Sequence, residues 1–294
     1  MIQHVLAAVD LFMPDVKVIR RAAAISRDSS APLTVLHVVE HADMTLWPRR
    51  VQERLIRDAM LADARSKLET FVANNCTEAS SASLRIEAGA PHDRILSVAE
   101  QIGADFIILG ANQRQSLRDK ILGSTADRVV RHAGTPVLVV KRRREGHYRR
   151  AIAAIDLESG ADHVISAARD ICRNGNLQLV HVVDLPLPFE QALLRSGWGA
   201  VELSRHREAL EMDARQRLNE LARQAPGPAS ARTEVIVGET AASLVKLSRR
   251  RAVDLMVIGR EERGWPLRVL LGSVAFRLLH EAGCDILVVG RPAA

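Results

Sequence analysis

The sequence predicts an α/β protein made of two tandem domains, each a doubly wound sheet of five parallel strands. Residues 106–140 and 255–289 follow one pattern of strand, glycine, basic loop, Gly-Ser pair, helix and strand, offset by 149 residues. A repeat of this length indicates a duplicated domain, because stacked repeat arrays use units of roughly 20 to 50 residues. Apolar segments and helical patterns alternate in both halves, which is typical of β-α-β units. We expect the domains at residues 1–144 and 145–294, each long enough to bury a core.

Five short apolar segments should form the strands of the first half, because they are rich in Val, Ile and Leu as buried parallel strands are. They cover residues 2–10, 33–39, 83–89, 105–110 and 136–141. The helical patterns between them cover residues 15–28, 47–74, 91–102 and 124–132. Pro14 and Pro91 suit the first turn of a helix, where a missing N–H costs nothing. The hydroxyl of Ser124 is expected to cap the fourth helix.

The second half repeats this order of elements. Its expected strands cover residues 150–156, 177–183, 232–238, 253–259 and 285–290. Its expected helices cover residues 161–172, 188–224, 241–251 and 273–280. The apolar stripe of the long second helix is interpreted as core or inter-domain packing. Ligands of doubly wound sheets bind beyond the carboxyl ends of the strands, so functional residues are expected there.

Composition narrows the classes of function. Hydrophobic residues make up 47% and charged residues 26%, and no apolar run approaches the roughly 18 residues of a membrane span. The three cysteines lie far apart, which predicts a reducing, cytoplasmic location. The net charge of +6 includes a basic cluster at residues 141–150, interpreted as a solvated linker. An aromatic content of 3% argues against nucleic-acid binding.

The ends of the first and fourth strands match between the two halves. Asp10 and Asp156 each end a first strand. Either aspartate alone could cap the following loop, but the matched positions favour a hydrogen bond to a ribose hydroxyl or an adenine amino group. Gly110 and Gly259 each end a fourth strand, where the absence of a Cβ lets a flat ring approach the backbone.

A Gly-Ser pair opens the next helix in each half. The pairs are Gly123-Ser124, followed by Thr125, and Gly272-Ser273. The first turn of a helix offers unpaired N–H groups and the positive end of the helix dipole, which attract phosphate. Two glycine turns at one fixed spacing, each after a buried strand, are a more specific signal than one Gly-Ser pair.

Over nearly the whole chain these motifs resemble those of two-domain universal stress proteins, the E-type subgroup. The signature of the family's ATP-binding members is Gly-x2-Gly-x9-Gly-Ser/Thr, after an Asp at the end of the first strand. Both halves keep the spacing, but Gln113 and Glu262 replace the middle glycine.

The resemblance implies a fold similar to that of adenine nucleotide alpha hydrolases, a role in the stress response and ATP as the ligand. It also implies that Val38 and Val182, which follow the histidines of "LHVV" and "VHVV", offer their backbones to the adenine. By resemblance, the last strands of the two domains pair into an intramolecular pseudo-dimer. Whether whole chains also form a homodimer stays open.

The replaced glycines favour the first half as the nucleotide site. A non-glycine residue in a left-handed conformation costs about 1–2 kcal/mol. A Glu262 carboxylate about 5 Å from a phosphate charge adds roughly 3 kcal/mol at an effective dielectric of 20. Arg260 and Arg263 could offset this repulsion or pair with Glu262. Gln113 is neutral, so the first half should bind ATP more tightly than the second.

Two further expectations concern chemistry. The sequence has no Gly-x4-Gly-Lys-Ser/Thr loop and no activated nucleophile, so we expect a non-enzyme without catalytic residues, in which any ATP hydrolysis is slow. His37, His41 and Asp43 lack a second cluster at zinc spacing, so no metal site is expected. The alternative hypothesis is a module with degenerate nucleotide sites that binds another small ligand or acts as a protein-interaction scaffold.

Overall fold

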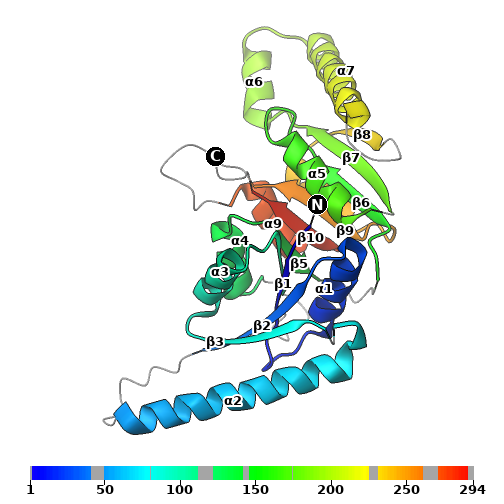
Figure 1. Ribbon diagram of the computed structural model, residues 1–294. Helices are drawn as coiled ribbons and strands as arrows, with labels where there is room; N and C mark the ends of the chain where they lie inside the picture. Colours follow the sequence, from blue (N-terminus) through cyan, green and yellow to red (C-terminus); the bar gives the residue numbers. More distant parts are fainter. Residues whose placement is uncertain are drawn as a thin grey trace. The chain divides into compact units, whose positions relative to one another are not determined.

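The chain folds into two compact units, and the boundary between them in the sequence lies between His147 and Tyr148. The computed structural model describes residues 2–40, 50–79, 81–111, 122–141, 146–173, 175–224, 231–260 and 271–290. Each unit is an α/β domain (Figure 1). Among the described residues, no helix combines the length and the apolar character that a membrane crossing requires.

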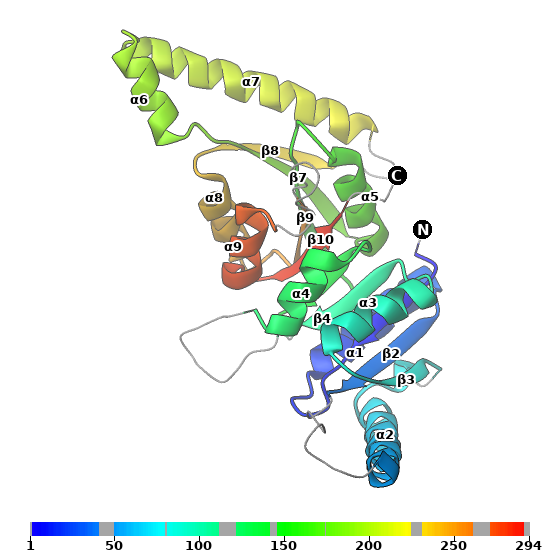
Figure 2. The same ribbon diagram turned by 90° about the vertical axis from the view of Figure 1, so that its left-hand side faces the viewer.

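The first unit has a parallel sheet with the strand order β3-β2-β1-β4-β5. Its strands are β1 Val5–Ala8, β2 Leu33–Val39, β3 Ser83–Ala88, β4 Phe106–Gly110 and β5 Val137–Val140. Its helices are α1 Val16–Ser29, α2 Arg50–Asn75, the 3-10 helix η2 Thr77–Ala79, α3 Pro91–Gln101 and α4 Ser124–His132. Helices α3 and α4 pack together, as do α1 and α2 (Figure 2). The strand order reverses between β1 and β4, as a doubly wound sheet requires.

The second unit has the same topology, with the order β10-β9-β6-β7-β8. Its strands are β6 Arg150–Ala154, β7 Asn176–Val183, β8 Arg232–Val237, β9 Leu255–Gly259 and β10 Asp285–Val289. Its helices are α5 Ala161–Ile171, α6 Leu187–Arg195, α7 Ala200–Gln224, α8 Thr240–Ser248 and α9 Ser273–Glu281. Its strand order reverses between β6 and β9. The predicted fold class of two tandem parallel α/β domains is confirmed.

Two expected helix starts are wrong in detail. Helix α1 begins after Asp15, whose carboxylate accepts a backbone hydrogen bond as the N-cap, so Pro14 precedes the helix. Helix α4 has Gly123 as its N-cap and no side-chain capping bond, so the hydroxyl of Ser124 is not the cap. Pro91 does lie in the first turn of α3, as predicted. Asp15 is the N-cap because its Oδ1 accepts from the free backbone N–H of Lys17 in the first turn of the helix.

The predicted helix over residues 188–224 is two helices, α6 and α7, which pack as a hairpin (Figure 2). Gly197 separates them with φ +97°, a left-handed conformation that glycine adopts without steric cost. The apolar stripe is only partly buried, because Leu203 is 8% exposed whereas Leu194 and Val201 are 49% and 64% exposed. Core packing therefore explains only part of this stripe.

An aspartate anchors the first strand to the fourth strand in both units. Asp105 Oδ2 accepts hydrogen bonds from two successive backbone N–H groups ahead of β1, at 2.5 and 2.8 Å. Asp254 Oδ2 accepts from the corresponding pair at the start of β6, at 3.1 and 3.2 Å. A carboxylate that accepts two backbone N–H groups makes strong, charge-assisted bonds. The relative position of the two central strands is therefore fixed at their amino ends.

The Cys172 thiol is buried at the C-cap of α5. Its Sγ donates to the carbonyl oxygen of Tyr148 at 3.3 Å. Burial raises the pKa of this thiol to about 11, because the thiolate loses its hydration in an apolar surrounding. The side chain therefore stays protonated at neutral pH and acts as a packing residue.

This pKa predicts a loss of stability at alkaline pH. Above an ordinary thiol pKa of 9.0 the unfolded chain loses the Cys172 proton, whereas the folded chain keeps it up to about 11. The unfolded state then binds fewer protons, so the free energy of unfolding falls as the pH rises through this window, by up to about 3 kcal/mol. Urea unfolding of wild type and Cys172→Ala at successive pH values measures this component. Parallel curves for the two proteins would contradict it.

Candidate functional site

The reversal of strand order brings Asp10 close to Gly110, and Asp156 close to Gly259. Strands β1 and β4 pair in register almost to their carboxyl ends, and so do β6 and β9. Each aspartate follows its strand by two residues, and each glycine is the last residue of its strand. In each unit the two residues therefore lie at the same edge of the sheet, the usual ligand position of this topology.

Both aspartates make the same local turn. Asp10 Oδ1 accepts from the backbone N–H of Phe12 at 2.9 Å. Asp156 Oδ1 accepts from the backbone N–H of Glu158 at 2.9 Å, and its Oδ2 accepts from the Ser159 hydroxyl at 3.3 Å. The loop-capping role that the sequence left open is therefore present in both units. It holds two exposed carboxylates at the strand ends.

Two histidines hold the backbone that carries these aspartates. His37 Nδ1 on β2 lies 3.0 Å from the carbonyl oxygen of Val9, and His181 Nδ1 on β7 lies 2.9 Å from that of Ile155. A carbonyl oxygen only accepts, so Nδ1 carries the proton in both rings. Each carbonyl directly precedes the strand-end aspartate, so the histidines are positioning residues that sequence reasoning missed. The available signal was the shared histidine of "LHVV" and "VHVV".

No metal site is expected at His37, His41 and Asp43. His41 and Asp43 lie outside the described residues, and His37 uses Nδ1 for the bond to the backbone. Within the described ranges, no group of three or more His, Cys, Asp or Glu residues could hold a metal ion.

The strand-end glycines allow the first helix of each unit to approach the sheet. A Cβ on Gly110 would lie 3.3 Å from Val18 Cγ2 and 3.4 Å from Asp15 Oδ2. A Cβ on Gly259 would lie 3.4 Å from Val164 Cγ2. Helices α1 and α5 therefore pack directly beside these glycines. This contact supplies a packing reason for glycine at the end of the fourth strand.

The start of α4 lies next to the end of β4. The backbone N–H of Gly123 donates to the carbonyl oxygen of Ala111 at 3.2 Å, and Ala111 directly follows Gly110. Ser124, the first residue of α4, is exposed, and Thr125 is half-buried. Gly110 and Gly123, which are 13 positions apart in the sequence, thus lie at the same edge of the sheet. The first turn of a helix leaves N–H groups without partners inside the helix, and the first turn of α4 lies at this edge.

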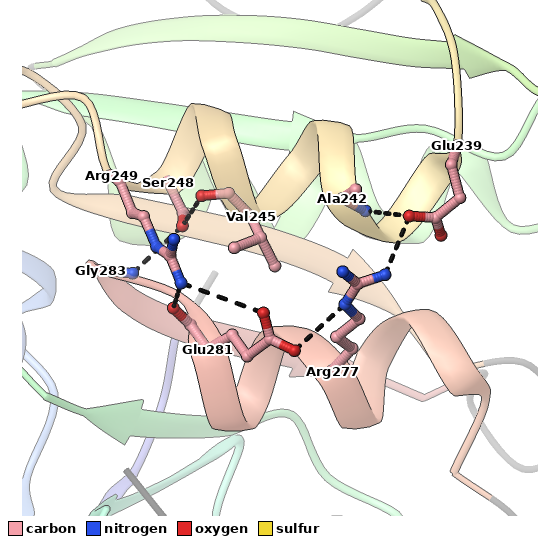
Figure 3. Close-up of polar contacts among 8 residues, drawn as sticks. All are labelled: Glu239, Ala242, Val245, Ser248, Arg249, Arg277, Glu281 and Gly283. Atoms are coloured by element: carbon pink, nitrogen blue, oxygen red, sulfur yellow. Dashed lines mark hydrogen bonds and ion pairs between the residues drawn. The ribbon is translucent and has the colours of Figure 1, made fainter. Parts of the chain in front are cut away.

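In the second unit Gly272 is likewise the N-cap of α9, which begins at Ser273. A chain of charges holds this helix against α8 (Figure 3). Arg277 contacts Glu239 at 2.9 Å and Glu281 at 3.1 Å. Glu239 also caps α8 through two backbone N–H groups, at 3.0 and 2.7 Å. These exposed pairs contribute about 1 kcal/mol or less each, so they position α9 more than they stabilise the unit.

The remaining predicted site residues are Val38, Val182, Gln113 and Glu262. Val38 and Val182 lie on β2 and β7, one residue before the carboxyl ends of those strands. They are therefore at the same edge of each sheet as the strand-end aspartates. Gln113 and Glu262 lie outside the described residues.

The family model and the most similar curated proteins agree on one family. The model of the universal stress protein family matches residues 1–141 and again residues 147–290. Universal stress protein G of Shigella flexneri is 28% identical over 144 residues, which cover 48% of this chain and 100% of that protein. Universal stress protein A homolog 1 of Coxiella burnetii is 31% identical over 146 residues, which cover 49% of this chain and 96% of that protein.

Solved structures share the two-unit fold over the full chain. A functionally unknown protein from Pseudomonas aeruginosa PAO1 superposes with a TM-score of 0.66 at 18% identity, covering 99% of this chain and 93% of that one. A universal stress protein from Archaeoglobus fulgidus superposes with a TM-score of 0.59 at 16% identity, covering 98% and 96%. At these identities the likeness shows the fold alone.

Proposed function

The chain belongs to the universal stress protein family, and from that premise we propose that its first unit binds an adenine nucleotide, ATP, at the carboxyl edge of the sheet. The observation that carries the proposal is the hydrogen bond between Gly123 and Ala111. It places the start of α4 beside the strand end that carries Gly110, and Asp10 lies at the same edge. A helix start next to a strand-order reversal suits a nucleotide phosphate.

Each residue has a proposed role in binding. The Asp10 carboxylate accepts a hydrogen bond from a ribose hydroxyl, and the backbone of Val38 contacts the adenine. Gly123, Ser124 and Thr125 offer N–H groups and hydroxyls to the phosphates, where the positive end of the α4 dipole favours negative charge. The buried bond from His37 to the strand end keeps Asp10 in place without contacting the ligand. The proposal assigns no catalytic residue, and binding is the function.

The second unit presents the corresponding residues Asp156, Val182, Gly259, Gly272 and Ser273. We propose that it binds ATP more weakly, because the carboxylate that replaces its middle glycine repels phosphate. The proposed biological role is a regulatory or protective one in the cytoplasmic stress response.

Native mass spectrometry of the purified chain, followed by calorimetric titration with ATP, tests the proposal. We expect one bound nucleotide per chain, and the same spectrum shows whether chains form a homodimer. No retained nucleotide and no heat with ATP would favour the alternative, a scaffold or a receptor for another small ligand, which the replaced middle glycines also fit.

Gln113→Gly should tighten ATP binding about tenfold, because a left-handed backbone costs a non-glycine residue about 1–2 kcal/mol. The measurement is the dissociation constant for ATP of the variant and of wild type under identical salt. Unchanged affinity would show that the replaced glycine does not limit binding.

A further inference from the structure

An apolar turn follows the strand-end aspartate of the first unit. Phe12 and Met13 lie two and three residues after Asp10, and their side chains are 79% and 45% exposed. The Asp10 carboxylate holds the backbone of this turn, because its Oδ1 accepts from the Phe12 N–H at 2.9 Å. A phenyl ring that is anchored by its backbone and still largely exposed adds little to the core. Its apolar surface is therefore available to a ligand.

The Phe12 ring lies on the β2 side of this sheet edge. Its centroid is 6.1 Å from that of the His37 ring, and the two ring planes are inclined by 55°. His37 directly precedes Val38 near the carboxyl end of β2, which is the place proposed for the adenine. The start of α4 lies by the end of β4, on the other side of β1. Phe12 is thus at the base end of the proposed site and not at its phosphate end.

The second unit has a charged residue at the same position of the turn. Glu158 follows Asp156 by two residues, and its backbone N–H makes the same bond to Asp156 Oδ1, at 2.9 Å. Arg217 of α7 holds this turn as well. Its Nη1 donates to Glu158 Oε1 at 3.1 Å, and its Nη2 donates to the carbonyl oxygen of Leu157 at 2.7 Å. The turn of the second unit is therefore closed by an ion pair.

The first unit has no such clamp among its described residues. Leu68 of α2 and Leu218 of α7 are both fully buried and lie 150 residues apart, so Lys67 corresponds to Arg217. Lys67 contacts Asp63 of its own helix, at 2.7 Å. The two turns thus share their backbone bond and differ in what they present, which is an aromatic ring in one unit and a paired carboxylate in the other.

We propose that Phe12 is the surface on which the base of the nucleotide stacks, so that the first unit selects a nucleotide by its base as well as by its phosphates. The inference rests on the proposed function of this edge and adds the residue that recognises the base. Every base has a π-face that can stack on an aromatic side chain. The paired carboxylate of Glu158 offers no such face, so the second unit lacks this contact.

A different role for Phe12 is that it only covers the buried His37. The second unit argues against this role, because His181 keeps the same bond to its strand-end carbonyl, at 2.9 Å, beside a turn that carries Glu158. A covering ring would also be buried itself, whereas most of the Phe12 surface is exposed. The two roles predict different effects. Loss of a cover lowers the stability of the unit, and loss of a stacking surface lowers its affinity for a base.

Calorimetric titration of wild type, Phe12→Ala and Phe12→Trp with ATP and with inorganic tripolyphosphate tests the inference. We expect Phe12→Ala to weaken ATP binding about 5- to 150-fold, the range for losing one base–aromatic stack, and Phe12→Trp to retain it. Tripolyphosphate has no base and should not distinguish the three proteins. Equal ATP affinity of wild type and Phe12→Ala would overturn the inference, and so would a parallel loss of tripolyphosphate binding.

Glu158→Ala is the matched control. It removes the side chain at the same turn position of the second unit and should leave the affinity of the first unit for ATP unchanged. Thermal unfolding of each variant checks its fold.

Fluorescence separates the inference from the proposed function. ATP and adenosine should quench the tryptophan fluorescence of Phe12→Trp more than that of wild type, whereas tripolyphosphate should not. If wild type binds no ATP, the proposed function fails, and adenosine quenching of Phe12→Trp then judges the stacking role by itself. Equal quenching of the two proteins by adenosine would overturn that role.

Discussion

Gly175→Ala should lower the free energy of unfolding by about 3 kcal/mol, at the upper end of typical overpacking costs. Gly175 lies in the turn between α5 and β7. A Cβ there would overlap Cys172 Sγ, and it would lie 2.5 Å from the Tyr148 carbonyl oxygen and 2.9 Å from that of Arg149. Both carbonyls are backbone groups that accept hydrogen bonds, from Cys172 and from Asn176. Relief of the clash would therefore break bonds between α5, β6 and β7.

Urea denaturation of Gly175→Ala and of the control Gly134→Ala measures this effect. Gly134 has no positive φ, and a Cβ there would meet nothing within 4 Å. The control should change the free energy of unfolding by less than about 0.5 kcal/mol, as surface substitutions usually do. Equal effects of the two variants would show that the turn at Gly175 relaxes without cost.

The architecture could be predicted because buried parallel strands appear in the sequence as short runs of Val, Ile and Leu. A fixed offset between Gly110 and Gly259 then gave the duplication. The errors were local. The break at Gly197 depends on one backbone torsion. The start of α1 depends on whether Asp15 lies inside the helix or caps it. Both errors concern the ends of helices, which sequence patterns define less well than helix interiors.

The site was predictable where it depended on strand ends and was missed where it depended on contacts between elements. The position of Asp10 follows from the end of β1, whereas the bond from His37 to the carbonyl before that aspartate depends on how β2 lies beside β1. The position of the Phe12 ring near His37 depends on the same packing, which no periodicity encodes. A signal did exist, because Phe12 follows Asp10 at the spacing at which Glu158 follows Asp156.

The two units share the hydrogen bonds that position their central strands, and they differ in the capping of a helix. The aspartate anchors at the amino ends of the strands and the histidine bonds near the carboxyl ends occur in both. One difference lies at the start of the helix between the third and fourth strands. In the second unit Glu239 caps α8 and pairs with Arg277 of α9, whereas α3, the counterpart of α8 in the first unit, has Ala90 as its N-cap and no side-chain capping bond. The two units therefore share the bonds that fix their central strands and differ in how this helix is capped.

Asp10→Ala should weaken ATP binding about 10- to 100-fold, because a hydrogen bond to a charged group contributes about 1.5–3 kcal/mol. Asp156→Ala is the matched control and should leave the affinity of the first unit for ATP unchanged. Both substitutions remove the same backbone turn, with bonds of 2.9 Å to Phe12 and to Glu158. Their structural costs should therefore be similar, and the difference in affinity isolates the contact with the ligand.

Asp10→Asn separates the turn from the charge. An amide oxygen still accepts from the Phe12 N–H, so the turn should persist, while the negative charge at the strand end is lost. Calorimetric titration with ATP should place its affinity between those of wild type and Asp10→Ala. If Asp10→Ala and Asp156→Ala bind ATP equally well, the carboxylate of the first unit serves only its turn. Nucleotide binding at this edge would then depend on the helix start and the backbone alone.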